Sequence, residues 1–142
     1  MIGRVWGLVP VAAAVALATA GPAALGAVGT PVSYSAAQAA AGEKLYAAKC
    51  SACHGDRLEG GAGPALSGAD LTKYAKITKL SVGDMFTFMS QQMPLNEPAS
   101  LTHDQYVAVM AYIPHYNGYK TGPKPLTYDA ALNSTTHVQS MK

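Results

Sequence analysis

The chain has 142 residues, which is enough for one small domain. Its ten basic and eight acidic residues give a formal net charge of +2 at pH 7. So small a charge offers no electrostatic case for nucleic acid as a partner.

Residues 1–27 have the pattern of a secretory signal peptide. Arg4 precedes an apolar run, and small residues around Ala20 and Ala27 offer two cleavage points, of which we favour the second. The alternative is an uncleaved membrane anchor, although Pro10 weakens a continuous helix there. Cleavage would leave about 115 residues with nine basic and eight acidic side chains. The folded part is therefore expected outside the cytoplasm, in the periplasm.

A helix is predicted after a short leader at residues 28–34. Ser35 and Gln38 form a capping box, which opens an alanine-rich helix that runs to the first cysteine. Along this helix three residues recur at intervals of four and share one face: Gly42, Tyr46 and Cys50.

A glycine-rich loop is predicted at residues 55–68, because its glycines and Pro64 oppose regular structure. Residues 70–80 then carry lysines at intervals of three, which are Lys73, Lys76 and Lys79. Such a run usually marks a solvated helical face. The alternative is a weak docking surface for an acidic partner.

Two further helices are predicted in the second half of the chain. Ser81 to Asp84 has the form of a helix start, and Pro94 ends that helix, so residues 93–100 are expected to be extended. Thr102 and Gln105 form another capping box. Asn117-Gly118 is the C-terminal signal of the helix that follows, which Pro114 is expected to kink or to end early. The part from Tyr119 onward is polar and proline-marked, and we expect it to be loosely organised.

The two cysteines stand in the pentapeptide Cys50-Ser51-Ala52-Cys53-His54. A dithiol catalyst would place the pair at the start of a helix beside a sheet, whereas this pair ends a predicted helix. A structural zinc site needs about four ligands. The remaining histidines are too far apart to supply a second pair: His103, His115 and His137. A disulfide across so short a loop would stabilise little.

The fifth residue of this motif decides between these chemistries. C-x-x-C-H is the attachment pattern of a c-type haem. Each thiol of Cys50 and Cys53 adds across one vinyl group, and the imidazole of His54 ligates the iron. We therefore predict one covalent haem c.

Met93 is the predicted second axial ligand, because methionine or histidine usually completes the coordination of iron in an electron carrier. It lies in an extended segment fixed by Pro94, about 40 residues after His54, which lets the chain wrap around the haem. The other candidates have plainer explanations: Met85, Met89 and Met110 as core, His103 and His115 as surface, and His137 and Met141 as tail residues. A bis-histidine site through His103 or His115 is the alternative.

Through the C-x-x-C-H motif and the Met93-Pro94 segment, residues 35–122 resemble the class I, single-haem c-type cytochromes. The resemblance implies an all-α cytochrome c fold, with several helices and long loops around the haem. In the segment GPAL, the carbonyl of Pro64 is then expected to accept a hydrogen bond from the other nitrogen of the axial histidine, and Leu66 to contact the haem. Gly42, Tyr46 and Tyr112 match positions where the first and last helices cross.

The run MPLNEPASLTHDQYVAVMAYI is similar to the family segment in which the methionine before proline binds iron. Together with NGYKTGPKPL it is most similar to cytochrome subunits and carriers of periplasmic dehydrogenases. Pro114 departs from the family, whose last helix continues unbroken. Residues 123–142 are expected to be a C-terminal extension of the cytochrome domain.

These features predict an electron carrier rather than an enzyme, with both axial positions of the iron filled. Burial of the haem under Leu66, Tyr46, Ile113 and Met110 would favour a positive reduction potential. The expected partners are a redox donor and acceptor, which could be a dehydrogenase, an oxidase or a bc1-type complex of a respiratory chain. Membrane association would come through a partner or an uncleaved N-terminus. The alternatives are a tightly bound subunit of a periplasmic dehydrogenase, a haem enzyme or ligand sensor, and a thiol oxidoreductase.

Overall fold

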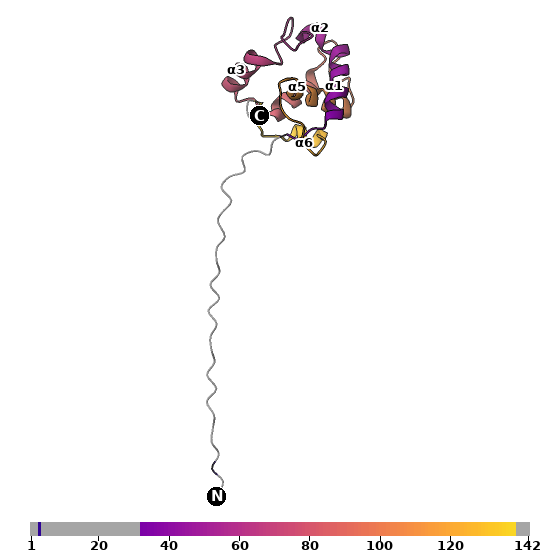
Figure 1. The fold of residues 1–142 in the computed structure, drawn as a ribbon. Helices are drawn as coiled ribbons and strands as arrows, with labels where there is room; N and C mark the ends of the chain where they lie inside the picture. Colours follow the sequence, from indigo (N-terminus) through magenta and orange to yellow (C-terminus); the bar gives the residue numbers. More distant parts are fainter. Residues whose placement is uncertain (1–2, 4–31, 139–142) are drawn as a thin grey trace.

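The computed structural model describes residue 3 and residues 32–138, and these form an all-α fold (Figure 1). The helices are α1 (Ala36–Lys49), α2 (Ser51–His54), α3 (Gly68–Thr78), α4 (Val82–Gln92), α5 (His103–Tyr116) and α6 (Tyr128–Leu132). In this part of the chain, β-structure is limited to one isolated bridge between Ser81 and His137. The predicted fold class is confirmed. The predicted signal peptide lies outside the described residues, apart from Gly3.

The helix starts read from the sequence are present as reciprocal caps. The side chain of Ser35 accepts the backbone N–H of Gln38, whose side chain reaches back to Ser35. Equivalent reciprocal pairs begin two further helices: Ser81 with Asp84 at the start of α4, and Thr102 with Gln105 at the start of α5. Each pair satisfies two of the N–H groups that a helix start leaves without partners. All three predicted helix starts are confirmed.

Helix α5 continues through Pro114, so the predicted early end is wrong. Proline has no N–H to donate, but its own carbonyl and that of Ile113 both accept N–H groups from residues after Tyr116. The backbone N–H of Asn117 donates to Ile113 at 3.2 Å, and that of Tyr119 donates to Pro114 at 3.1 Å. Gly118, with φ of +82°, ends the helix as the sequence indicated.

Helices α1 and α5 cross in close contact with each other (Figure 1). At the crossing, a Cβ placed on Gly42 would lie 1.9 Å from the carbonyl oxygen of Ala108. One turn away, the rings of Tyr46 and Tyr112 lie 5.4 Å apart. The glycine admits the second backbone, and the paired rings fill the space beside it. This arrangement places the C-terminal end of α1, which carries the first cysteine, against α5.

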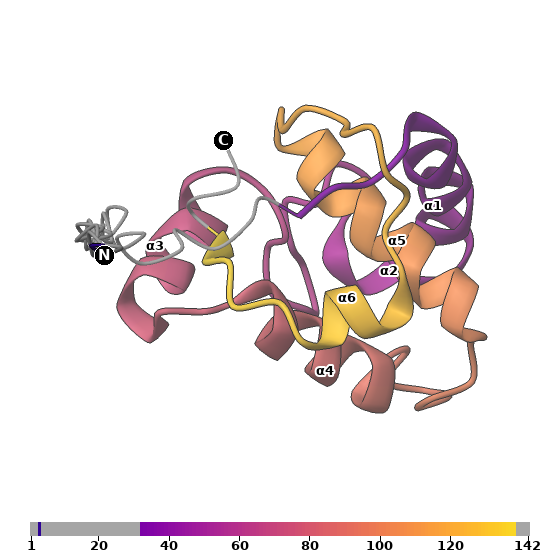
Figure 2. The same cartoon turned by 90° about the horizontal axis from the view of Figure 1, so that it is seen from below.

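The C-terminal part packs against the helices instead of being loosely organised (Figure 2). Helix α6 contacts both α4 and α5. Three apolar side chains from this part are buried in the core: Leu126, Ala131 and Val138. The ring of Tyr128 also packs edge-on against Phe86, with centroids 5.0 Å apart. These apolar residues are widely spaced in a polar segment, so the sequence pattern did not mark them as core. Their burial offsets the conformational entropy that is lost when the segment becomes ordered.

Backbone hydrogen bonds join the same part to the start of α4. The N–H groups of Val82 and Gly83 donate to the carbonyls of Thr136 and Ser134, at 2.8 and 3.0 Å. The N–H of Val138 in turn donates to Leu80 at 3.0 Å. Residues 126–138 therefore belong to the same folded unit as the helices.

Candidate functional site

The cysteine motif lies at the junction of α1 and α2. Cys50 ends α1 and begins α2, and its backbone N–H donates to Tyr46 at 2.8 Å. Both thiols are free: that of Cys50 is half-buried and that of Cys53 is exposed. His54 is the last residue of α2. One tight turn therefore carries two thiols and an imidazole.

A loop folded against the His54 ring orients its nitrogens. The Nδ1 atom lies 2.8 Å from the carbonyl oxygen of Pro64, as the resemblance implied. Since a carbonyl only accepts, this geometry assigns the proton to Nδ1 and leaves the lone pair of Nε2 free for a metal. Gly63 passes so close to the ring that a Cβ there would lie 2.8 Å from Cε1 of His54. Its N–H donates to Cys53 at 2.8 Å, which fastens this loop to the motif.

Leu66 is held in place from two sides. Its N–H donates to the carbonyl of Leu58 at 2.8 Å, and its own carbonyl accepts the side-chain amide of Asn117 at 3.0 Å. The side-chain oxygen of Asn117 also accepts the N–H of Gly68 at 3.1 Å. The sequence indicated Asn117 only as a helix terminus. Its role as a clamp depends on a contact 51 residues away along the chain, which no local pattern reveals.

An apolar cluster lies beside these groups. Its buried members are Tyr46, Leu58, Val109, Tyr112 and Ile113, and the half-buried side chains against it include Cys50, Leu66, Met85 and Met89. Tyr46 also donates its hydroxyl to the carbonyl of Gly55 at 2.7 Å. Of the four residues expected around a haem, only Met110 lies in the other cluster, where it is 1% exposed.

Met93 is the half-buried C-cap of α4. It follows Met85 and Met89 at intervals of four, but its backbone is already extended, with φ of −115° and ψ of 153°, so it stands just past the helix end. Its carbonyl accepts the hydroxyl of Tyr106 at 2.6 Å. The loop after it also reaches the cysteine end of α1, because Lys49 Nζ lies 3.7 Å from Glu97 Oε2.

The rival ligands lie elsewhere. His103 is exposed and stacks on Tyr128, with ring centroids 3.7 Å apart. His115 is exposed and meets the edge of Tyr34, and the exposed His137 ring lies 3.0 Å from the carbonyl oxygen of Lys79. Met141 lies outside the described residues. Among residues 3 and 32–138, no group of three His, Cys, Asp or Glu residues is arranged to hold a metal ion.

The environment of the Cys50 thiol does not suit a thiol oxidoreductase. Burial raises the pKa of the Cys50 thiol, and the neighbouring Cys53 raises it further. Catalytic cysteines require the opposite shift, because the thiolate is the nucleophile. This finding weighs against that alternative.

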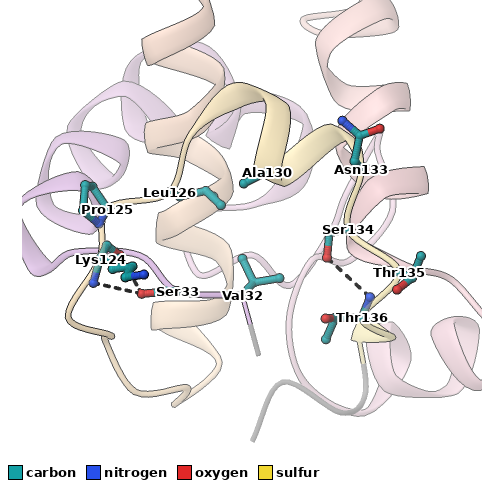
Figure 3. A pocket seen from close by; sticks show the side chains of 10 residues that line it. All are labelled: Val32, Ser33, Lys124, Pro125, Leu126, Ala130, Asn133, Ser134, Thr135 and Thr136. Atoms are coloured by element: carbon teal, nitrogen blue, oxygen red, sulfur yellow. Dashed lines mark hydrogen bonds between the residues drawn. The ribbon is translucent and has the colours of Figure 1, made fainter. Parts of the chain in front are cut away.

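Two further surface features are a set of exposed lysines and a cleft. The lysines Lys73, Lys76 and Lys79 are exposed on and just after α3, among the exposed side chains of Tyr74 and Ile77. A cleft of about 370 Å³ lies between Val32 and Ser33 on one side and residues 124–136 on the other (Figure 3). No predicted site residue lines this cleft.

Within the described part of the chain, no helix is both long and apolar enough to cross a bilayer.

Residues 37–113, more than half of the chain, match the family described as cytochrome c oxidase, cbb3-type, subunit III. The chain belongs to this family of c-type cytochromes. The crystal structure of the sulfane dehydrogenase SoxCD from Paracoccus pantotrophus contains a chain similar to this cytochrome, at 25% identity and a TM-score of 0.50. That similarity covers 66% of this cytochrome and 50% of the SoxCD chain, so this cytochrome spans about half of it. A comparison with curated proteins finds no match.

Membership of this family implies a c-type haem and supports electron transfer as the role of this cytochrome. The residues present fit such a group. Two free thiols and an imidazole with an available Nε2 lie in one turn, beside a cluster of apolar side chains. The predicted resemblance to c-type cytochromes is confirmed.

Proposed function

We propose that this cytochrome carries single electrons in the periplasm through one haem c. Cys50 and Cys53 would hold the haem by thioether bonds, and His54 Nε2 and Met93 Sδ would be its axial ligands. The hydrogen-bond geometry between His54 Nδ1 and Pro64, at 2.8 Å, is the observation that carries this proposal. It presents the opposite ring nitrogen as a donor within the turn that also bears both thiols.

The chain's own residues would set the properties of the site. When bound, a haem with both axial positions filled exchanges one electron between Fe(III) and Fe(II) and offers no open position to a substrate. The Pro64 carbonyl raises the donor strength of His54. Methionine sulfur raises the reduction potential, and the apolar cluster around Leu66 disfavours the extra charge of the oxidised iron. A positive potential is the expected result.

The partners would be a redox donor and acceptor, such as a dehydrogenase and an oxidase or bc1-type complex. The predicted signal peptide at residues 1–27 supports a periplasmic location. The exposed lysines of α3 are the surface that we propose for transient contact with an acidic partner.

Two variants expressed in a host that matures c-type cytochromes test the ligands. Met93→Leu should abolish the long-wavelength sulfur-to-iron absorption band of the ferric protein. Met89→Leu, the same change four residues earlier in the last turn of α4, should retain it. Haem that is lost on acid extraction would contradict the thioether bonds, and an unchanged spectrum in Met93→Leu would contradict the axial methionine.

A permanent subunit of a dehydrogenase is the second candidate. The similarity to a chain in the SoxCD sulfane dehydrogenase structure favours it. Size-exclusion chromatography of native extract distinguishes the two, because a free carrier elutes at the mass of the mature chain and a subunit elutes with its complex.

A haem enzyme or ligand sensor would require a weakly held sixth ligand. Carbon monoxide binding to the reduced protein at neutral pH would support that class. Persistence of the Met93-dependent band, with no binding of carbon monoxide, would support the electron carrier.

A further inference from the structure

The segment that follows the predicted iron ligand has little attachment to the core. Pro94 is buried, but residues 95–100 are exposed, with Leu95 at 76%. Turns within the segment join Glu97 to Pro94 at 2.9 Å and Ser100 to Glu97 at 3.3 Å. Its ion pair with Lys49 is between half-exposed side chains, and such pairs contribute little. Packing of residues 95–100 therefore does not determine where Met93 lies.

Tyr106 supplies a fixed point at both ends of this segment. Its side chain is 3% exposed and belongs to the main core cluster, in the first turns of α5. Its hydroxyl donates to the Met93 carbonyl at 2.6 Å, a short and strong geometry. The same oxygen accepts the N–H of Leu101 over a longer 3.4 Å. The buried side chain of Tyr106 thus ties Met93 and Leu101, which flank the segment, to one helix.

The Met93 carbonyl is suited to this contact. It belongs to the C-cap of α4, where carbonyls have no partner within the helix. The Met93 N–H still donates to Met89 at 3.1 Å, so α4 and Tyr106 hold the backbone of this residue on two sides. With the backbone fixed on both sides, only side-chain rotations remain to direct the sulfur.

We propose that Tyr106 is a positioning residue that keeps the Met93 sulfur on the iron. The proposal rests on the proposed function, since it presupposes that Met93 is the axial ligand. Without the hydroxyl, one of the two hydrogen bonds that fix the Met93 backbone would be lost, and the sulfur would be held less firmly. The fraction of protein that has lost the iron–sulfur bond would then rise about three- to tenfold, the range expected for one hydrogen bond.

Tyr106→Phe removes only this hydroxyl and tests the proposal in the matured holoprotein. Tyr119→Phe is the matched control, because its hydroxyl also donates to a backbone carbonyl, that of Val138 at 3.1 Å, in another part of the fold. The readout is the pH at which the ferric sulfur-to-iron band disappears. We expect this pH to be lower than in wild type by about 0.5 to 1 unit in Tyr106→Phe and to be unchanged in Tyr119→Phe. Carbon monoxide should also bind the reduced Tyr106→Phe protein faster.

The outcomes separate this proposal from the proposed function. A band absent from the wild type, or one that survives Met93→Leu, overturns the axial methionine and the role of Tyr106 with it. A band lost in Met93→Leu but equally stable to pH in wild type and both tyrosine variants overturns only the role of Tyr106. Failure of Tyr106→Phe alone to yield holoprotein also overturns it, because the hydroxyl would then serve folding rather than the sulfur.

Discussion

The Nδ1 atom of His54 lies 2.8 Å from the carbonyl oxygen of Pro64, ten residues further along the chain. This contact decides which ring nitrogen is available to a metal, because the nitrogen facing a carbonyl must carry the proton. The loop that provides the carbonyl is itself fastened to Cys53 through the N–H of Gly63. The cysteine motif and the orientation of the His54 ring are therefore parts of one local structure.

Gly63→Ala should disturb that orientation. The added Cβ would lie 2.8 to 3.1 Å from three atoms of the His54 ring, closer than such contacts tolerate. Displacement of the ring would lengthen its bond to Pro64, weaken its donation and so destabilise the oxidised iron. We expect the reduction potential to rise by on the order of 50 mV, which is close to tenfold in a one-electron equilibrium.

Ala62→Val is the control for that measurement, because Ala62 is exposed in the same loop. Redox titration of both variants should show a shift in Gly63→Ala alone. Equal potentials in the two variants would mean that the loop yields to the methyl group without moving the ring.

Gly42→Ala should destabilise the crossing of α1 and α5. Its Cβ would lie 1.9 Å from the Ala108 carbonyl oxygen, which is backbone and cannot move aside cheaply. Although alanine favours helix more than glycine does, we expect a net loss of about 1–3 kcal/mol in the free energy of unfolding. Denaturant titration measures it against Ala40→Leu, which adds atoms at an exposed position of α1. A Gly42→Ala variant as stable as wild type would show that the helices can separate without cost.

The sequence was sufficient for the local features of this fold. The helix starts at Ser35, Ser81 and Thr102 were predictable because a capping box involves residues only three apart. The turn that carries both cysteines and His54 was recognisable for the same reason, since the C-x-x-C-H pattern spans only five residues. Together with the resemblance to c-type cytochromes, these features were enough for the all-α class.

Contacts between distant segments were not predictable in this way. Asn117 clamps Leu66, and Tyr106 holds the Met93 carbonyl, through side chains whose local sequence indicates only a helix. Leu126 and Val138 are single apolar residues in polar surroundings, so no periodicity marked them as core. The continuation of α5 past Pro114 to Tyr116 was likewise not visible in the local sequence.

Leu126→Ala should show that the C-terminal part contributes to stability. Leu126 is 6% exposed, and its backbone exchanges two hydrogen bonds with the side chain of Gln38 in α1. Loss of its buried side chain should cost about 2–4 kcal/mol of unfolding free energy. Leu95→Ala, at a position 76% exposed, should cost less than about 0.5 kcal/mol. Similar small losses in both variants would indicate that residues 126–138 are dispensable for the fold.

The start of α4 should make stability depend on pH. The Ser81 hydroxyl donates to the Asp84 carboxylate at 2.6 Å, and the Ser81 N–H donates to it at 3.1 Å. These hydrogen bonds hold the pKa of Asp84 below its usual range, and the charge of His137 lowers it further. Folding thus depresses this pKa, so the contribution is complete above the unfolded value of about 4 and is lost as pH falls through the folded value.

Asp84→Asn should remove this contribution. Thermal unfolding between about pH 6 and pH 2 should therefore show a shallower fall in midpoint for Asp84→Asn than for wild type. Asp70→Asn is the matched control, because Asp70 also lies in the first turn of a helix, α3. The N-cap residue of α3 is Ser67, and its side chain forms no capping hydrogen bond. It should retain the wild-type slope. Parallel pH profiles for wild type and both variants would show that the capping carboxylate of α4 does not couple protonation to folding.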